Sequence, residues 1–418
     1  MIITSHHSNR YEVDKSCEEI GGKMQKPIRI FTPYNEFIAE ISNYESLMFI
    51  RSWSGIGDLE LRINRYKKYT DKLQKRNIIV IGDDRHKAYL ILHKEIELNE
   101  QGKATENWLI KALELKIVMG EKLTLPPLHT AYDNKQGPAE TVMKHYINNN
   151  VINPIDIRRK NPQLLMATDL KRGINVNWQS RFKNLGEELT EISLLSGIGW
   201  NVSMDYSQKK WISDVLEGRN LSANQNTHSP VIFSPQFDNI QNMSFVDSDL
   251  NYRNVAYVAG QGEGVERRVI EVGKAEGLFR FETFVDARDI EETMEIEVPD
   301  GEGGTTTETV PRPEKEIIKD LTDRGNQQLA QLTQEHYLEG QIITHSTFKY
   351  EEDYDLGDIV TLQNKDWGVT LDARITEIKE IYEVGSPFQI EATFGNNRPT
   401  ILKKIKQSLA QMSGEVRR

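Results

Sequence analysis

Apolar and polar residues alternate along several short stretches in the first third of the chain. In DLELRIN, Leu59, Leu61 and Ile63 are separated by charged or polar residues, and this stretch follows the apolar SLMFIRSW across the turn SGIG. NIIVIGDDRHKAYLILHKEIEL and NWLIKALELKIVMG repeat the arrangement. Alternation with a period of two predicts strands that bury one face. We therefore predict a small antiparallel β-barrel domain over residues 28–127.

Between residues 128 and 230 the pattern changes to a helical period. GPAETVMKHYINNN begins with Pro138, which the first turn of a helix tolerates. NLGEELTEISLLSG places Leu185 and Ile192 on one face and ends at Gly197, a residue typical of helix C-termini. WNVSMDY and KKWISDVLEG predict a hairpin. Together these elements predict an α+β middle domain.

Strand patterns return after Pro230 and predict a second β-barrel domain over residues 231–399. The acidic, Gly- and Thr-rich stretch at about 290–313 predicts a long loop within it, and the next stretch, about 314–337, predicts an inserted helix. The predicted fold class is α+β, mainly β, with two small antiparallel barrels flanking the middle domain.

Two terminal segments lie outside these three domains. Residues 1–27 are polar and predict an N-terminal extension. Residues 400–418 predict an amphipathic helix, which begins at the N-cap Thr400. That helix packs either on its own domain or on a neighbouring molecule, and the pattern leaves both alternatives open.

Length, charge and cysteine content limit the classes of protein to which the chain can belong. The chain has 418 residues, of which 38% are hydrophobic and 28% charged, as expected of a soluble protein with two to four domains. Its net charge is 52 − 63 = −11, whereas a protein that grips nucleic acid needs a positive surface. With the single cysteine Cys17, no disulfide can form within the chain. We expect neither a secretory signal nor a membrane-spanning segment.

Three glycines in YVAGQGEGVERRV, namely Gly260, Gly262 and Gly264, suggest a phosphate-binding loop. The dinucleotide fingerprint needs a further glycine where Val265 stands, and it needs a helix where VERRVIEVG predicts a strand. The sequence therefore favours a wide turn between two strands, because glycine tolerates positive φ.

The other candidate metal-binding and catalytic motifs lack the residue spacing that they require. DSDLNY starts like a calcium loop, but Tyr252 and Val258 stand where glycine and glutamate are required. The nine histidines, His6 and His7 included, show no zinc-protease spacing, and Ser196 lacks the first glycine of a hydrolase turn. Cys17 has no plausible base nearby. We predict no catalytic, cofactor-binding or metal-binding residue and no cofactor, although a pair of glycosidase carboxylates stays open because sequence does not give their separation.

Five stretches in the second half carry a resemblance to a known family: GRNLSANQ, VIFSPQFDNI, VDSDLNYRNVAYVAGQGEGVERRV, FVDARD and YDLGDIVTLQN. With the barrel hairpins, they resemble the tail-hub (baseplate-hub) proteins of long-tailed bacteriophages, in the branch found in siphoviruses and prophages of Gram-positive hosts. The resemblance covers residues 28–396. It is densest from Gly218 to Asp289 and from Tyr354 to Asn364.

The resemblance implies a structural virion protein and no enzyme. Such hubs are homotrimers at the distal tail tip, made in the cytoplasm of the host bacterium. Each subunit carries two similar β-barrels, so three subunits match a hexameric ring. The implied partners are the distal tail protein ring, the tape-measure protein, and tail fibres or receptor-binding proteins.

The resemblance also implies that the closed hub plugs the tube, takes part in host attachment and opens for genome ejection. DNA then passes through the lumen without specific binding, and we expect an acidic lumen to let it slide. Some larger relatives carry a cell-wall hydrolase after the hub, and we expect none in the residues after Asn396. Two alternatives remain: a virion-associated cell-wall-degrading enzyme, and a glycan-binding host-adhesion module.

Overall fold

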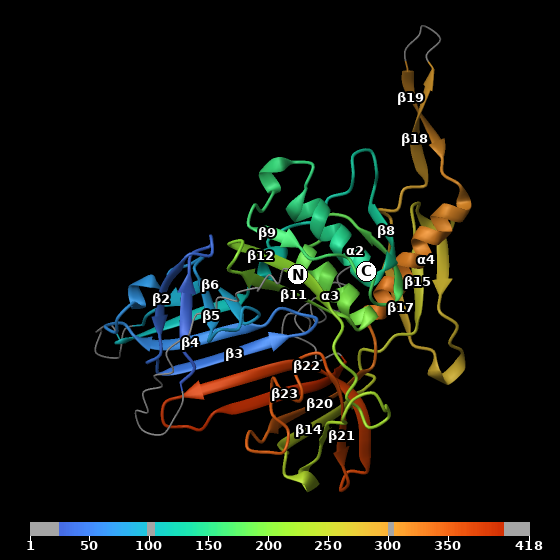
Figure 1. The fold of residues 1–418 in the computed structure, drawn as a ribbon. Helices are drawn as coiled ribbons and strands as arrows, with labels where there is room; N and C mark the ends of the chain where they lie inside the picture. The colour runs from blue at the N-terminus through green and yellow to red at the C-terminus, as the bar shows by residue number, and fades with distance from the viewer. Residues whose placement is uncertain (1–24, 98–104, 300–304, 397–418) are drawn as a thin grey trace, which may run out of the picture.

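The structure is a computed structural model that describes residues 25–97, 105–299 and 305–396. The predicted C-terminal helix and nearly all of the predicted N-terminal extension lie outside the described residues. Figure 1 shows four groups of elements: a β group at the N-terminal end, a mixed group, a second β group, and an α/β group that ends in a projecting hairpin. We call them the first β unit, the middle unit, the second β unit and the insert.

The first β unit contains seven antiparallel strands in the order β2-β1-β5-β6-β7-β4-β3. Their bounds are β1 (Ile28–Phe31), β2 (Phe37–Ile41), β3 (Ser46–Ser52), β4 (Asp58–Asn64), β5 (Ile78–Ile81), β6 (Ala88–Glu95) and β7 (Asn107–Glu114). The predicted hairpins β3–β4 and β5–β6 are confirmed. Leu59, Leu61 and Ile63 alternate into the core, whereas β5 is buried on both faces because the middle unit packs on its outer side.

The middle unit places two packed helices against two small sheets. Its elements are α1 (Ile117–Gly120), β8 (Asp133–Pro138), α2 (Ala139–Ile147), β9 (Leu164–Met166), β10 (Asn175–Ser180), α3 (Leu185–Ser196), β11 (Gly199–Asp205) and β12 (Lys210–Leu216). The sheets are β10-β8 and β11-β12-β9, and β11–β12 is the predicted hairpin. The Asn184 side chain accepts from the Glu187 N–H at the start of α3, and Gly197 ends the helix with positive φ.

The second β unit continues the sheet of the first. Its strands are β13 (Ile232–Phe233), β14 (Ile240–Ser248), β20 (Glu335–Ile342), β21 (Ile359–Asn364), β22 (Val369–Glu383) and β23 (Gln389–Asn396). The first half of β22 pairs with β21, and its second half lies between β23 and β3. The mainly β, α+β class is confirmed. Among the described strands, the two β units form one open pairing path from β14 to β2, so neither is closed by a ladder of its own.

The insert, residues 249–334, leaves the second β unit between the paired strands β14 and β20. It contains β15 (Val255–Ala259), β16 (Val269–Val272), β17 (Glu282–Asp286), β18 (Thr293–Pro299), β19 (Thr305–Pro311) and α4 (Glu314–Gln331). Helix α4 covers one face of the sheet β16-β15-β17 and also contacts β10 and α3 of the middle unit.

Within the insert, the prediction of a loop was wrong, whereas the predicted helix is confirmed as α4 with an earlier end. The stretch predicted as an acidic loop at about 290–313 forms the antiparallel pair β18–β19, because Met294, Ile296 and Val298 alternate with polar residues. The helix predicted at about 314–337 ends at Gln331, since the chain enters β20 at Glu335.

Candidate functional site

The three main units meet at one buried tryptophan. Trp53 follows β3 of the first β unit, and its Nε1 donates to the Gly197 carbonyl of the middle unit at 3.1 Å. On the side of the second β unit, Gly357 lies so close that a Cβ there would stand 2.0 Å from the ring. The Arg374 guanidinium lies over the same ring, 5.4 Å from its centre. One side chain therefore fixes the relative positions of three units.

A buried cluster of charged residues joins the two β units beside this tryptophan. Lys87, which precedes β6, is fully buried and donates to the carboxylates of Glu380 on β22 and of Glu351. Although burial lowers the pKa of Lys87, the two carboxylates outweigh it and raise that pKa above its ordinary value. On β3, Arg51 donates to Asp355 at 2.8 Å. Because these charges are paired, the cluster is suited to joining the units rather than to proton transfer.

A second buried amine lies between the first β unit and the middle unit. Lys116 Nζ donates to the Ser52 carbonyl at 2.6 Å and to the Trp200 carbonyl at 3.3 Å, and it lies 3.3 Å from Glu114 Oε2. Burial lowers the pKa of Lys116. Amines with a lowered pKa can serve as bases or nucleophiles, but Lys116 is 1% exposed and its donors are engaged, which indicates a structural role.

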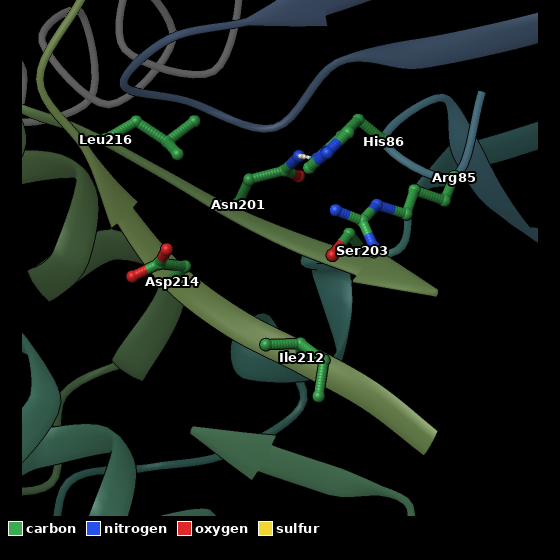
Figure 2. Close-up of a pocket in the computed structure, with 7 residues that line it drawn as sticks. All are labelled: Arg85, His86, Asn201, Ser203, Ile212, Asp214 and Leu216. Atoms are coloured by element: carbon green, nitrogen blue, oxygen red, sulfur yellow. Dashed lines mark hydrogen bonds between the residues drawn. The ribbon is translucent and has the colours of Figure 1, made fainter. Parts of the chain in front are cut away.

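A small open pocket lies where the first β unit meets the middle unit (Figure 2). It is lined by Arg85, His86, Asn201, Ser203, Ile212, Asp214 and Leu216. Its volume of about 130 Å³ is small beside the roughly 300–1,000 Å³ of usual ligand pockets.

The polar groups of this pocket are mostly engaged with protein. Asp214 Oδ1 accepts from Lys144 at 3.1 Å and from Arg172 at 3.3 Å. The Asn201 amide lies 3.4 Å from His86 Nδ1 (Figure 2), and burial lowers the pKa of His86. A carboxylate held by two cations is a poor general acid, so the pocket lacks the features of a glycosidase site.

The glycine-rich stretch forms the predicted turn between β15 and β16, with positive φ at Gly262 and Gly264. Arg267 lies inside the turn. Its Nε donates to the Gly260 carbonyl at 2.9 Å, and its Nη2 donates to the Ala259 carbonyl at 3.0 Å. Because the turn directs carbonyls at a cation rather than amides at an anion, it is not a phosphate cradle.

The remaining candidates from the sequence stand apart in the structure. Asp247 of the calcium-like stretch lies on β14, 3.5 Å from His336, and the described part of the chain brings together no group of three His, Cys, Asp or Glu able to hold a metal. The Ser196 hydroxyl donates to the Ile192 carbonyl one turn earlier in α3. His6, His7 and Cys17 lie outside the described residues. Of the helices that the structure describes, none is long and apolar enough to cross a membrane.

Comparison with known proteins gives a consistent result. No curated protein matches the chain. Among solved structures, the 43 kDa tail protein of prophage MuSo2 from Shewanella oneidensis matches with a TM-score of 0.50 at 11% identity, covering 89% of this chain and 98% of that one. The tail protein from Neisseria meningitidis MC58 matches with a TM-score of 0.48 at 10% identity (88% and 96% covered).

Prophage tail protein gp18 from Listeria monocytogenes EGD-e matches with a TM-score of 0.47 at 11% identity (92% and 98% covered). The match to the Shewanella tail protein, with its TM-score of 0.50, shows similarity of fold alone, because the identity is only 11%. The evidence from sequence is a family model, described as Siphovirus ReqiPepy6 Gp37-like protein, which matches residues 27–396. The chain therefore belongs to the Siphovirus ReqiPepy6 Gp37-like family of phage tail proteins.

Proposed function

We propose that the protein is the tail hub of a siphovirus, a homotrimer at the distal end of the tail tube that performs no catalysis. Family membership and a fold shared with a prophage tail protein support a structural role in the tail. In this proposal the trimer closes the tube, anchors the host-recognition components and opens for DNA ejection.

The observation that carries the proposal is the ladder between β22 and β3. It runs from Glu377↔Ser52 to Glu383↔Ser46 and joins the two β units side by side in one sheet. The buried pair Lys87–Glu380 reinforces the same boundary. A chain that presents two β units in a fixed relation offers six such units in a trimer, which suits a six-fold ring of distal tail proteins. We propose the four units as the domains of the hub.

The proposed partners follow from this position in the tail. The distal tail protein ring is above the hub, the tape-measure protein reaches it through the tube, and tail fibres or receptor-binding proteins attach around it. Three copies carry 3 × −11 = −33 charges, and an acidic lumen would repel DNA phosphates. Replacing the Asp and Glu residues that face the lumen with Lys should therefore slow DNA ejection from assembled phage. Unchanged ejection would contradict the acidic lumen.

The experiment that tests the hub combines three measurements. Light scattering on the purified chain should give the mass of three copies, and mixing with the distal tail protein should yield a joint complex. Labelling in electron micrographs of intact tails should place the chain at the distal tip. A label elsewhere in the virion would overturn the proposal, and release of muropeptides from cell walls by the purified chain would support the enzyme alternative.

A further inference from the structure

Strands β18 and β19 form a narrow ribbon that stands away from the rest of the molecule (Figure 1). The ribbon is a two-stranded sheet of its own. Met294, Ile296 and Val298 alternate along β18, and they lie directly across from Val310, Glu308 and Thr306, so this face of the ribbon is largely apolar and carries one carboxylate, that of Glu308. Met294 is 40% exposed. Because a two-stranded ribbon is marginally stable in water by itself, this face is suited to packing against another surface.

The ribbon is strongly acidic. Strands β18 and β19 contain three acidic residues, Glu295, Glu297 and Glu308, and no lysine or arginine. Glu308 is exposed on the same face as Ile296, whereas Glu295 is exposed on the opposite face. A surface that receives the ribbon should therefore combine exposed apolar side chains with positive charge.

The middle unit carries such a surface between α2 and β9. We define the basic patch as Ile155, Ile157, Arg158, Arg159 and Lys160. The two isoleucines are 75% and 69% exposed, well above what a core residue shows. With the intervening Asp156, the local charge is 3 − 1 = +2.

The backbone of the basic patch is held in place. The Asp156 carboxylate accepts from the Arg158 N–H at 3.0 Å and from the Arg158 guanidinium at 2.8 Å. Arg159 donates to the Leu123 carbonyl, which ties the patch to the chain that follows α1. A patch ordered in this way loses little conformational entropy when it binds a partner.

We propose that the ribbon of one copy docks on the basic patch of the next copy, so that identical contacts close a ring of three. The inference rests on the proposed homotrimer and names its interface. In Figure 1 the ribbon rises from one side of the molecule, while the stretch between α2 and β9 lies at the opposite side of the middle unit, so the two surfaces do not meet within one chain. A head-to-tail contact between two different surfaces closes into a ring when each copy is rotated by a third of a turn.

Charge reversal on each side of the contact tests this interface. The ribbon variant carries Glu308→Lys, which lies on the docking face, and the patch variant carries Arg158→Glu with Lys160→Glu. Each should raise the protein concentration at which half of the chains are trimeric by about tenfold, as measured by light scattering. The variant with all three substitutions restores complementary charges and should return toward the wild-type value. Glu36→Lys and Lys365→Glu, at exposed positions in the two β units, serve as matched controls and should leave the trimer unchanged.

The outcomes separate this inference from the proposed function. If both reversed variants stay as trimeric as wild type, the interface is wrong and the hub proposal stands. If each variant dissociates but the combined variant does not recover, the ribbon and the patch each contact another surface within the trimer, and the proposed pairing of the two is wrong. A wild-type chain that stays monomeric at every concentration would contradict the homotrimer and this inference together. Thermal unfolding of each variant near the wild-type temperature excludes misfolding as the cause of dissociation.

Discussion

At the scale of single residues, Gly357 determines whether the second β unit can approach Trp53. Its φ is +91°, and a Cβ would stand 2.0 Å from the tryptophan ring. We expect Gly357→Ala to lower the free energy of unfolding by about 3 kcal/mol or more, because it adds a steric clash to backbone strain. Gly368 also has positive φ, but nothing lies within 4 Å of its added Cβ. Gly368→Ala should therefore cost only about 1 kcal/mol in urea unfolding. Equal costs would show that the contact with Trp53 is unimportant.

We expect Glu191 on α3 to make the stability of the chain depend on pH. Burial raises its pKa to about 7, and the neighbouring Glu188 carboxylate adds to the shift while Lys183 opposes it. Its Oε2 is buried without a hydrogen-bond partner among the described residues. Since the folded pKa is above the unfolded one, the folded chain holds this proton more tightly, and the associated stability is lost as the pH rises through about 7.

The substitution Glu191→Gln removes this titration. We expect it to stabilise the chain by about 1–2 kcal/mol at about pH 8 and by little at about pH 5, measured by urea unfolding at both pH values. Glu36→Gln, an exposed change in the first β unit, serves as the control. A stability difference between wild type and Glu191→Gln that does not vary with pH would contradict the burial of this carboxyl.

The buried ion pair of Lys87 and Glu380 could not be predicted from the sequence. Glu380 stands in the alternating stretch ITEIKEIYE and has the composition of an exposed strand position. A bulge between Ile375 and Glu377 changes which residues face inward, so that Ile378, Glu380 and Tyr382 are all buried. A shift of one residue exchanges the two faces of a strand. Because local pattern does not reveal such a bulge, neither Glu380 nor its partner Lys87 was predictable as a buried residue.

At the scale of elements, the junction of β22 with the first β unit depends on that pair. In Lys87→Met the Glu380 carboxylate keeps the Tyr382 hydroxyl at 2.8 Å and the Tyr350 hydroxyl at 3.1 Å but loses its buried cation. We expect a loss of about 3–5 kcal/mol in the free energy of unfolding. Adding Glu380→Gln removes the uncompensated charge and should recover part of that loss.

A surface pair provides the comparison for this experiment. Lys349 and Glu352 lie 3.4 Å apart, and both side chains are more than two-thirds exposed. Lys349→Met should change stability by no more than about 0.5 kcal/mol, because exposed ion pairs contribute little. If Lys87→Met were equally mild in urea unfolding, the buried cluster would not hold the two β units together.

Elements formed by neighbouring segments were predictable, and elements formed by distant ones were not. The hairpins β3–β4, β5–β6 and β11–β12 follow from alternation on either side of a short turn. The ladder between β22 and β3 joins segments from opposite ends of the chain, and neither segment contains a pattern that identifies the other as its pairing partner. The ribbon β18–β19 was not predicted, because its many acidic residues and threonines are typical of a loop. The alternation of Met294, Ile296 and Val298 was the signal that could have indicated a strand.

At the scale of the whole molecule, the net charge of −11 favours passage of DNA along the protein over binding of DNA to it. A protein that neutralises several phosphates releases counterions, and its affinity falls about 10³- to 10⁵-fold between about 50 and 200 mM salt. An assembly of three copies carries 3 × −11 = −33 charges, so its average field repels the duplex. A channel lined by such a protein would let DNA slide because it offers few contacts to break.

We therefore predict that the purified chain, whether monomeric or trimeric, does not bind double-stranded DNA at about 50 mM salt, where electrostatic attraction would be strongest. Fluorescence anisotropy with a labelled duplex of about three helical turns measures this directly. The same titration at about 200 mM salt is the internal control, because a true phosphate-binding protein loses most of its affinity over this range. A complex at low salt that disappears at high salt would reveal a basic surface able to hold DNA, and would contradict passage of the genome without binding.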